Sequence, residues 1–321
     1  MSDRPNRPRY AARLNAFGAR DGVAEMIRRA GAVPGLDAAD LNFPDHVEGH
    51  APQALGAMLS DAGLALNGFA MRYYGDPRLK LGAFTHPDAA IRQAAVDLTR
   101  RGLDALAATG GRLMTVWAGQ DGWDYAFQAD HARMWDMTAE ALAAIADHNR
   151  QIEVSVEYKP NEPRAFSVLP DMATTLLMLS EVRRDNLGVT LDFAHALYAG
   201  ESPARAATLA ARSSRLLGVH LNDGYGKRDD GLIAGAVHPA QTVELFVALE
   251  RIGHDGVIYF DTFPDASGTD AAAEAGASIA LVEKLRAVAR TLAADPELAA
   301  ATARQDAPAT QRLLARALYG A

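Results

Sequence analysis

Short apolar segments alternate with longer helical patterns along most of the chain. The apolar segments, typical of buried parallel strands, cover residues 12–17, 37–42, 64–71, 112–118, 153–157, 188–192, 216–221 and 256–261. Helical patterns between them include residues 88–108, 131–149, 171–184, 202–213 and 239–251. Strand and helix alternating in this way predict an α/β fold, a closed (β/α)₈ TIM barrel, with an open doubly wound sheet as the alternative.

Further helical patterns follow the last predicted strand, at residues 280–292, 296–303 and 310–318. We therefore expect a barrel domain over residues 1–280 and a C-terminal helical extension over residues 281–321. The apolar side chains of Leu313, Leu314, Leu318 and Tyr319 favour an arm that contacts a neighbouring subunit in a homo-oligomer, a dimer or tetramer. The alternative is a final barrel helix with frayed ends.

Composition narrows the possible chemistry. Hydrophobic residues make up 49% of the 321 residues, charged residues 22%, and the net charge is −8. Nucleic-acid binding is disfavoured because it needs clustered Lys and Arg. The chain has no cysteine, which excludes disulfides and thiolate metal sites. The polar segment Met1–Pro5 lacks the apolar core of a signal peptide, and no apolar run is long enough to span a membrane, so we expect a cytoplasmic protein.

Ionisable residues recur where the later predicted strands end. Glu157, Asp192 and Asp261 close three of these strands, and His220 lies near the end of another. Because the carboxyl ends of barrel strands meet at one mouth, these groups should converge there and would repel one another without a cation. Their oxygen-rich donor set predicts a site for Mg²⁺, Mn²⁺ or Co²⁺. Each residue taken alone could instead be a polar strand cap.

The segment from Glu157 to Arg164 reads Glu-Tyr-Lys-Pro-Asn-Glu-Pro-Arg. Residues two apart on a strand point to the same side, so Glu157 and Lys159 can both face the barrel mouth. Glu157 would then bind metal, and Lys159 would present a positive charge to a substrate oxygen. The alternative is a surface salt bridge followed by a proline-rich turn.

This segment resembles the Glu-x-Lys-Pro-Asn-Glu-Pro-Arg motif of xylose isomerases, and L-rhamnose isomerases share its first part. Two further segments resemble xylose isomerases: residues 79–85, read as Leu-Lys-Leu-Gly-Ala-Phe-Thr, and residues 117–122, read as Trp-Ala-Gly-Gln-Asp-Gly. The resemblance spans roughly residues 35 to 265. It implies a TIM barrel that isomerises a sugar with the help of one or two divalent metal ions.

The resemblance also implies ligands for two metals. Glu157, Asp192, His220 and Asp261 would form the first site, with His220 in the place of a xylose isomerase aspartate, as in rhamnose isomerases. His195, three residues after the bridging Asp192, and Asp229 would hold the second metal. The family pattern there is Asp-x-Asp, whereas this chain has Gly231 in place of the second acid, so Asp230 or water would have to substitute.

The resemblance further implies the residues that act on the sugar. Lys159, Glu157, Asp192 and His195 would be catalytic. Phe84, Trp117 and Trp123 would wall the cavity, with Asn222 and His46 as further substrate-binding residues; ordinary packing is the alternative for the aromatic side chains, and an exposed loop position for His46. Pro44 occupies the place of the ring-opening histidine of xylose isomerases, which makes D-xylose a less favoured substrate.

We therefore expect an aldose–ketose isomerase that acts on a pentose or deoxyhexose by a metal-assisted hydride shift. Asp261 stands where related 3-epimerases have a glutamate, and this difference favours isomerisation. The alternatives are a ketose 3-epimerase or keto-sugar dehydratase on the same barrel, an apurinic-site endonuclease, and a sugar-binding barrel without catalysis.

Overall fold

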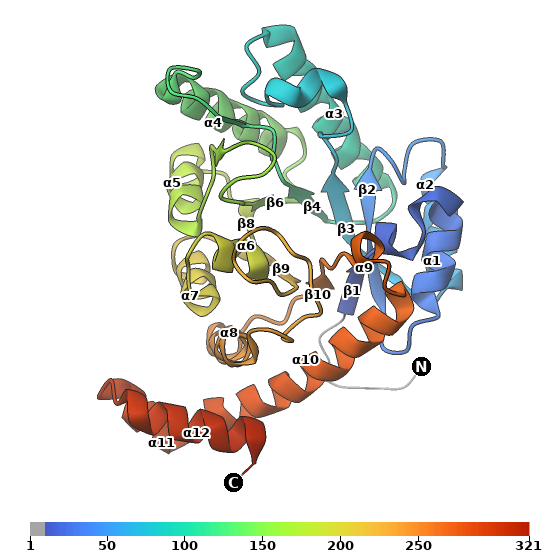
Figure 1. Cartoon of the computed structure of the whole chain (residues 1–321). Helices are drawn as coiled ribbons and strands as arrows, with labels where there is room; N and C mark the ends of the chain where they lie inside the picture. The colour runs from blue at the N-terminus through green and yellow to red at the C-terminus, as the bar shows by residue number, and fades with distance from the viewer. Residues whose placement is uncertain (1–9, 321) are drawn as a thin grey trace.

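Eight parallel strands close a barrel in the order β1-β10-β9-β8-β6-β4-β3-β2, in a computed structural model that describes residues 10–320 (Figure 1). The strands are β1 (Tyr10–Arg13), β2 (Ala38–Phe43), β3 (Ala65–Met71), β4 (Leu113–Val116), β6 (Glu153–Glu157), β8 (Leu187–Asp192), β9 (Leu216–Leu221) and β10 (Ile258–Phe260). This arrangement confirms the predicted TIM barrel. The polar segment Met1–Pro5 lies outside the described residues.

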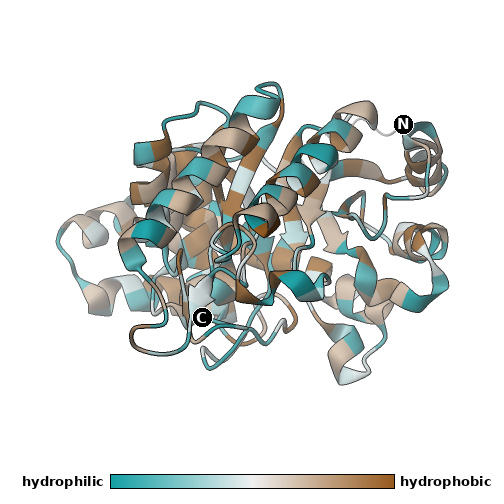
Figure 2. Cartoon of the chain, turned by 90° about the horizontal axis from the view of Figure 1, so that it is seen from above, coloured by the Kyte–Doolittle hydropathy of each residue, from teal (hydrophilic) through white to brown (hydrophobic). Residues whose placement is uncertain are grey.

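Helices surround the barrel and cover its strands (Figure 1). They are α1 (Val23–Gly31), α2 (Pro52–Asp61), α3 (Ala89–Ala108), α4 (His131–His148), α5 (Met172–Val182), α7 (Pro203–Ser213) and α8 (Pro239–Ile252). Two short helices, α6 (Phe193–Tyr198) and α9 (Pro264–Ser267), follow the ends of β8 and β10 and lie inside this ring. Aspartate side chains fix where several begin: Asp88, Asp130 and Asp171 accept hydrogen bonds from first-turn backbone N–H groups. Figure 2 shows hydrophobic strands at the centre and helices with hydrophobic and hydrophilic positions around them.

The first predicted strand is wrong over most of its length. β1 ends at Arg13, and Leu14–Phe17 forms a 3₁₀ turn. Leu14 and Phe17, three residues apart, are both buried because side chains at this spacing lie on one side of such a turn. Two short strands that were not predicted, β5 (Gly122–Trp123) and β7 (Phe166–Ser167), pair antiparallel in the loops that follow β4 and β6.

A polar layer inside the barrel lies directly beneath the strand ends that carry acids. The Ser155 Oγ and Thr190 Oγ1 atoms, both fully buried, are 2.5 Å apart. Strand alternation directs residues 155 and 157 to the same side, and residues 190 and 192 likewise. Glu157 and Asp192 therefore stand one step above this layer, at the mouth of the barrel.

The chain continues past the barrel as α10 (Ala271–Ala293), α11 (Pro296–Ala303) and α12 (Ala307–Tyr319). α10 passes through residue 280 without a break, so the barrel and the C-terminal extension share this helix (Figure 1). Leu313 is buried, whereas Leu314 and Leu318 are half-buried and Tyr319 is 78% exposed. None of the described helices has the length and apolar character needed to cross a membrane.

Candidate metal centre and substrate cavity

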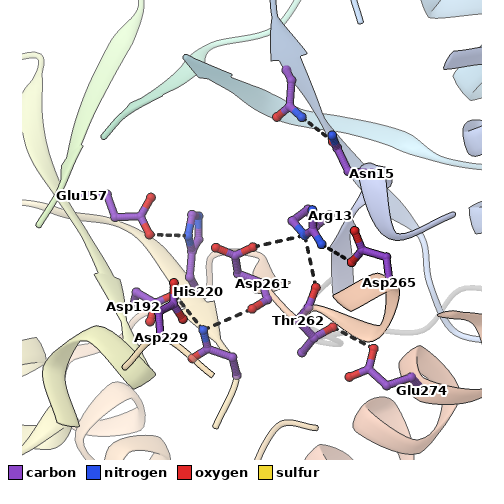
Figure 3. A network of polar contacts seen from close by, with 12 residues as sticks. Arg13, Asn15, Glu157, Asp192, His220, Asp229, Asp261, Thr262, Asp265 and Glu274 are labelled. Carbon is purple, nitrogen blue, oxygen red and sulfur yellow. Dashed lines mark hydrogen bonds and ion pairs between the residues drawn. The ribbon is translucent and has the colours of Figure 1, made fainter. Parts of the chain in front are cut away.

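Four side chains from four neighbouring strands meet at the barrel mouth. Glu157 ends β6, Asp192 ends β8, His220 lies in β9, and Asp261 follows β10. One potential ligand atom from each lies within 4.8 Å of those of the other three. The Nδ1 atom of His220 is 3.1 Å from Glu157 Oε1. These are the four residues expected to form the first metal site, and Figure 3 shows them facing one another.

A second group of ionisable side chains adjoins the first. The Asp229 Oδ2 atom lies 3.1 Å from His195 Nε2 and 3.1 Å from Lys159 Nζ. Glu157 connects the two groups, because its Oε1 atom is 3.5 Å from His195 Nδ1. Lys159 also pairs with Glu162, with an Nζ to Oε2 distance of 3.0 Å. The structure thus brings together the residues expected to form the second metal site and the lysine expected to act on substrate.

The close packing of these charges shifts their pKa values in opposite directions. Burial raises the pKa of Asp192 to about 7, although His195 opposes this rise. Burial disfavours protonated His220, yet the neighbouring Glu157 carboxylate raises the pKa of His220 to about 9. Asp229 is also buried, but His195 and Lys159 lower its pKa to about 2. Protons on the imidazoles thus offset part of the negative charge that a divalent cation would neutralise.

Amide and backbone groups hold the acids in place. Asn222 Nδ2 donates to Asp192 Oδ2 (3.1 Å) and to the backbone oxygen of Asp261 (3.2 Å). The Oδ1 atom of Asn222 accepts a hydrogen bond from the Ala194 backbone (2.9 Å). Asn222 is fully buried and is not part of the cavity wall, and its hydrogen bonds position two metal-site acids.

Arg13, the last residue of β1, contacts Asp261 and the residue that follows it. Its Nε atom donates to the Thr262 backbone oxygen (3.2 Å) and lies 3.8 Å from Asp261 Oδ1. Its guanidinium also pairs with Asp265 (Figure 3). Behind this group, Thr262 Oγ1 donates to the buried Glu274 carboxylate at 2.8 Å. The loop after β10 is thus tied to both β1 and α10.

Backbone conformation and packing require a glycine at position 231, where the Asp-x-Asp pattern has its second acid. Gly231 has a φ of 57°, in the left-handed region, and a Cβ there would overlap the Phe263 ring. Asp230 does not substitute for the missing acid, because its carboxylate accepts from the Tyr225 backbone and from Arg228 Nε, each at 2.8 Å. Of the two adjacent aspartates, only Asp229 reaches the cluster.

A cavity of about 510 Å³ opens beside the cluster and includes Glu157, Lys159, His195, His220, Asp229 and Asp261 in its wall. This volume suits a small sugar. Of the aromatic side chains expected to wall it, Trp117 does so, whereas Phe84 lines a small pocket next to it. Trp123 stacks on Phe166 with 5.5 Å between ring centroids and is not part of the cavity wall.

His46 is placed away from the cavity as well. It is 4% exposed, and its Nδ1 atom accepts a hydrogen bond from the Asn42 backbone at 3.1 Å. It is therefore not the exposed loop residue considered as an alternative. Burial lowers the pKa of His46 to about 4, so it stays neutral near pH 7.

Sequence reasoning missed several residues of the cavity wall. They are Arg13, Asn42, Arg72, Tyr74, Gln120, Glu162, Tyr259 and Phe263. Arg13 is the last residue of β1 and Arg72 directly follows β3. Polar residues at strand ends, the same signal that identified the acids, could therefore have identified these two.

The donors at the cluster fit a divalent cation. Four carboxylates and two imidazoles are gathered there, and two of their atoms, His195 Nδ1 and Asp229 Oδ1, are buried without a hydrogen-bond partner. Buried polar atoms without partners are rare in folded proteins and mark places where a ligand is expected. Oxygen and imidazole ligands are those that Mg²⁺, Mn²⁺ and Co²⁺ accept.

Several solved structures share the fold. A structure described as a D-tagatose 3-epimerase-like protein has a TM-score of 0.73, with 15% identity over 88% of this chain and 98% of that one. A structure of L-ribulose 3-epimerase has a TM-score of 0.69, with 17% identity over 88% of this chain and 96% of that one. At these identities the likeness concerns the fold.

Sequence comparison identifies the family. A xylose isomerase of Thermus thermophilus is 29% identical over 209 residues, which are 63% of this chain and 54% of the relative. The chain thus spans about half the length of the curated relatives it matches. The family described as "Xylose isomerase-like TIM barrel" matches residues 27–285, which is most of the chain. On this match, the chain belongs to the family of xylose isomerase-like TIM barrels.

Proposed function

We propose that the protein is a metal-dependent aldose–ketose isomerase that acts on a pentose or deoxyhexose. The observation that carries the proposal is the convergence of Glu157, Asp192, His220 and Asp261 within 4.8 Å at the wall of a sugar-sized cavity. Family membership and curated relatives named xylose isomerase support it.

Metal binding would divide between the two adjacent groups of side chains. Glu157, Asp192, His220 and Asp261 would hold one cation, and His195 with Asp229 would complete a second site that shares Glu157 and Asp192. A bound divalent cation would supply Lewis acidity to the substrate carbonyl and the hydroxyl next to it.

Lys159 is the residue that would act on the reacting oxygen. It is 7% exposed and its ammonium lies 5.3 Å from the centre of the Trp117 ring, so its position is restrained. The charges of Asp229 and Glu162 outweigh burial and raise the pKa of Lys159 above its usual value, which keeps it cationic. A fixed ammonium donates a hydrogen bond to the oxygen on which negative charge develops.

The proposed reaction moves one hydride and one proton. The hydrogen on carbon two passes to carbon one with its electron pair, the hydroxyl on carbon two loses its proton, and the former carbonyl oxygen gains one. The apolar faces of Trp117 and Met71 in the cavity wall would keep water from the migrating hydrogen.

A substrate panel tests the proposal. Aldoses such as D-xylose, D-lyxose, L-rhamnose and D-apiose, together with uronic acids, would be incubated with the protein and Mg²⁺, Mn²⁺ or Co²⁺, and the corresponding ketose measured. We expect ketose formation from at least one of them, which stops with EDTA and returns with added metal. Absence of metal-dependent turnover across the panel would contradict the proposal.

Ketose 3-epimerisation is the second candidate, favoured by the fold shared with the 3-epimerases. It would need a base of adequate reach on both faces of carbon three, and Asp261 is one methylene shorter than a glutamate. Two deuterium labels separate the reactions. Loss of deuterium from carbon three of a ketose to solvent, with formation of its carbon-three epimer, supports epimerisation, whereas transfer of deuterium from carbon two of an aldose to carbon one of the ketose supports a hydride shift.

We also propose that α11 and α12 contact a second copy of the chain. A groove of about 600 Å³ lined by α8, α10, α11 and α12 includes Leu298 and Leu314, and Tyr319, the last residue of α12, is 78% exposed. Light scattering should find an oligomer that Tyr319→Glu weakens without loss of helix content. A monomer at concentrations of tens of micromolar would contradict this arm.

A further inference from the structure

Arg72 is a cationic side chain of the cavity wall that lacks a carboxylate partner among the described residues. It directly follows β3, and its backbone N–H donates to the Phe43 oxygen at 2.8 Å, which fixes the start of the side chain at the barrel mouth. Its Nε atom is buried without a hydrogen-bond partner. A buried guanidinium donor with no acceptor is costly unless a ligand supplies one.

The other cations of the cavity wall differ from Arg72 in this respect. Lys159 pairs with Asp229 and Glu162, at 3.1 and 3.0 Å, and Arg13 pairs with Asp265. Both are therefore compensated within the chain. The charge of Arg72 is left for whatever occupies the cavity.

Aromatic rings hold Arg72 in position. Its guanidinium lies 5.1 Å from the centre of the Tyr74 ring, and the Tyr74 and Trp117 ring centroids are 5.9 Å apart. The ammonium of Lys159 lies 5.3 Å from the Trp117 centroid. The wall thus has Lys159 and Arg13 beside the metal cluster, and Arg72 at the far side of two aromatic rings from Lys159.

We infer that Arg72 binds a carboxylate at the end of the substrate remote from the metal cluster, so that the substrate is a five- or six-carbon sugar acid. This inference rests on the proposed isomerisation and puts a sugar acid in the place of the neutral pentose or deoxyhexose as its substrate. A single guanidinium with two parallel N–H donors matches a carboxylate in bidentate geometry. A phosphate group usually collects several cations or backbone N–H groups, and the wall beside Arg72 offers Ala70, Met71 and Tyr74.

Neither His46 nor Asp40 can supply a positive charge in the place of Arg72. His46 is buried, and burial, followed by the charge of Arg72, lowers its pKa to about 4, so it carries no charge near pH 7. Asp40, two residues before the cavity-wall residue Asn42 in β2, is an acid that accepts a hydrogen bond from Asn67 at 2.6 Å, so it supplies no positive charge. Removal of the Arg72 charge should therefore remove most of the preference for an anion.

Calorimetry on the Mn²⁺-loaded protein tests the inference without need of turnover. The ligands are matched pairs that differ only in a carboxylate or a CH₂OH at carbon six: D-glucuronate with D-glucose, D-galacturonate with D-galactose, and D-mannuronate with D-mannose. We expect the acid of at least one pair to bind at least about tenfold more tightly than its neutral partner. Arg72→Gln should reduce that preference to within about twofold.

Arg133→Gln is the matched control, because Arg133 is exposed on α4 and the described residues show no ion pair for its side chain. It should keep the full preference for the acid. Mn²⁺ titration of Arg72→Gln checks that the cluster is intact. Should Arg72→Gln lose Mn²⁺ binding, Arg72→Lys takes its place. Lysine keeps the charge but lacks the bidentate pair of donors, so Arg72→Lys should keep only part of the preference for the acid.

Two results would overturn the inference. One is binding of the neutral sugar as tight as that of the acid in every pair, which would make Arg72 a donor to hydroxyl groups. The other is an acid preference that survives Arg72→Gln. The proposed function fails separately, through absence of metal-dependent turnover, so a protein that binds sugar acids without isomerising them would retain the inference and lose the isomerase.

Discussion

The two sides of the barrel mouth are built from different chemistry. The side formed by β6, β8, β9 and β10 gathers carboxylates and imidazoles: the ligand atoms of Glu157, Asp192, His220 and Asp261 lie within 4.8 Å of one another, and Glu157 pairs with both His195 and His220. The side formed by β2, β3 and β4 presents Asn42, Arg72, Tyr74 and Trp117, which supply an amide, a guanidinium and two aromatic rings. The first side is suited to a cation and the second to the body of an organic ligand. Substitutions on the two sides should therefore change different quantities, metal affinity on one and substrate discrimination on the other.

The largest effect is expected from Asp192→Asn on the acidic side. Loss of a shared metal ligand should lower metal affinity by more than about 100-fold and turnover by about 10⁴-fold, as for one member of a catalytic unit. Asp185→Asn, in the exposed turn that precedes the same strand, is the matched control and should change neither.

The same variant should stabilise the metal-free protein. Burial raises the pKa of Asp192 to about 7, above the ordinary value of 3.8, so stability is lost as the pH rises through this interval and the carboxyl ionises. Asn carries no charge, and the melting temperature of metal-free Asp192→Asn at pH 8 should exceed that of the wild type. A lower melting temperature would show that the charge of Asp192 is not a source of repulsion.

The next largest effect is expected from Lys159→Met, at the boundary between the two sides. It keeps the length of the side chain and removes the ammonium, so kcat should fall by about 10²- to 10³-fold while Mn²⁺ affinity is kept or rises. Lys227→Met, in an exposed loop, is the control. Equal losses of metal affinity and kcat would assign Lys159 a role in holding Asp229 instead of one on the substrate.

The smallest effect is expected from His46→Asn, behind the side that faces the ligand. His46 has a pKa of about 4 in the fold against 6.5 when exposed, so the unfolded chain binds more protons in this interval and stability falls as the pH drops through it. Asn retains an acceptor for the Asn42 N–H and does not titrate. Urea unfolding in EDTA should find that, between pH 8 and pH 5, the wild type loses about 2 kcal/mol more than the variant. Parallel pH profiles would contradict this placement of His46.

The acidic side could be predicted from sequence because its signal is local. Glu157, Asp192 and Asp261 each end or follow an apolar strand, and barrel closure brings such ends together. The boundaries of β6 and β9 were predicted to the residue. The boundary predicted between the barrel domain and the C-terminal extension, after residue 280, falls inside α10. The helix continues through this position without interruption.

The other side depends on contacts that a linear pattern does not contain. Trp123 leaves the cavity because β5 pairs with β7, two loop segments far apart in the chain. Asn222 is predicted from the sequence as a substrate contact, yet its side-chain amide forms hydrogen bonds with the Asp192 carboxylate and with the backbones of Asp261 and Ala194. Burial of His46, and of an Arg72 Nε atom that has no hydrogen-bond partner among the described residues, likewise follows from tertiary packing.

The most direct test of the metal centre is an anomalous diffraction map from crystals grown with saturating Mn²⁺, recorded at the manganese edge. We predict a peak bounded by Glu157, Asp192, His220 and Asp261, and Asp192→Asn crystals should lose it. A cluster that keeps its four side chains in place and shows no anomalous peak between them would contradict the account.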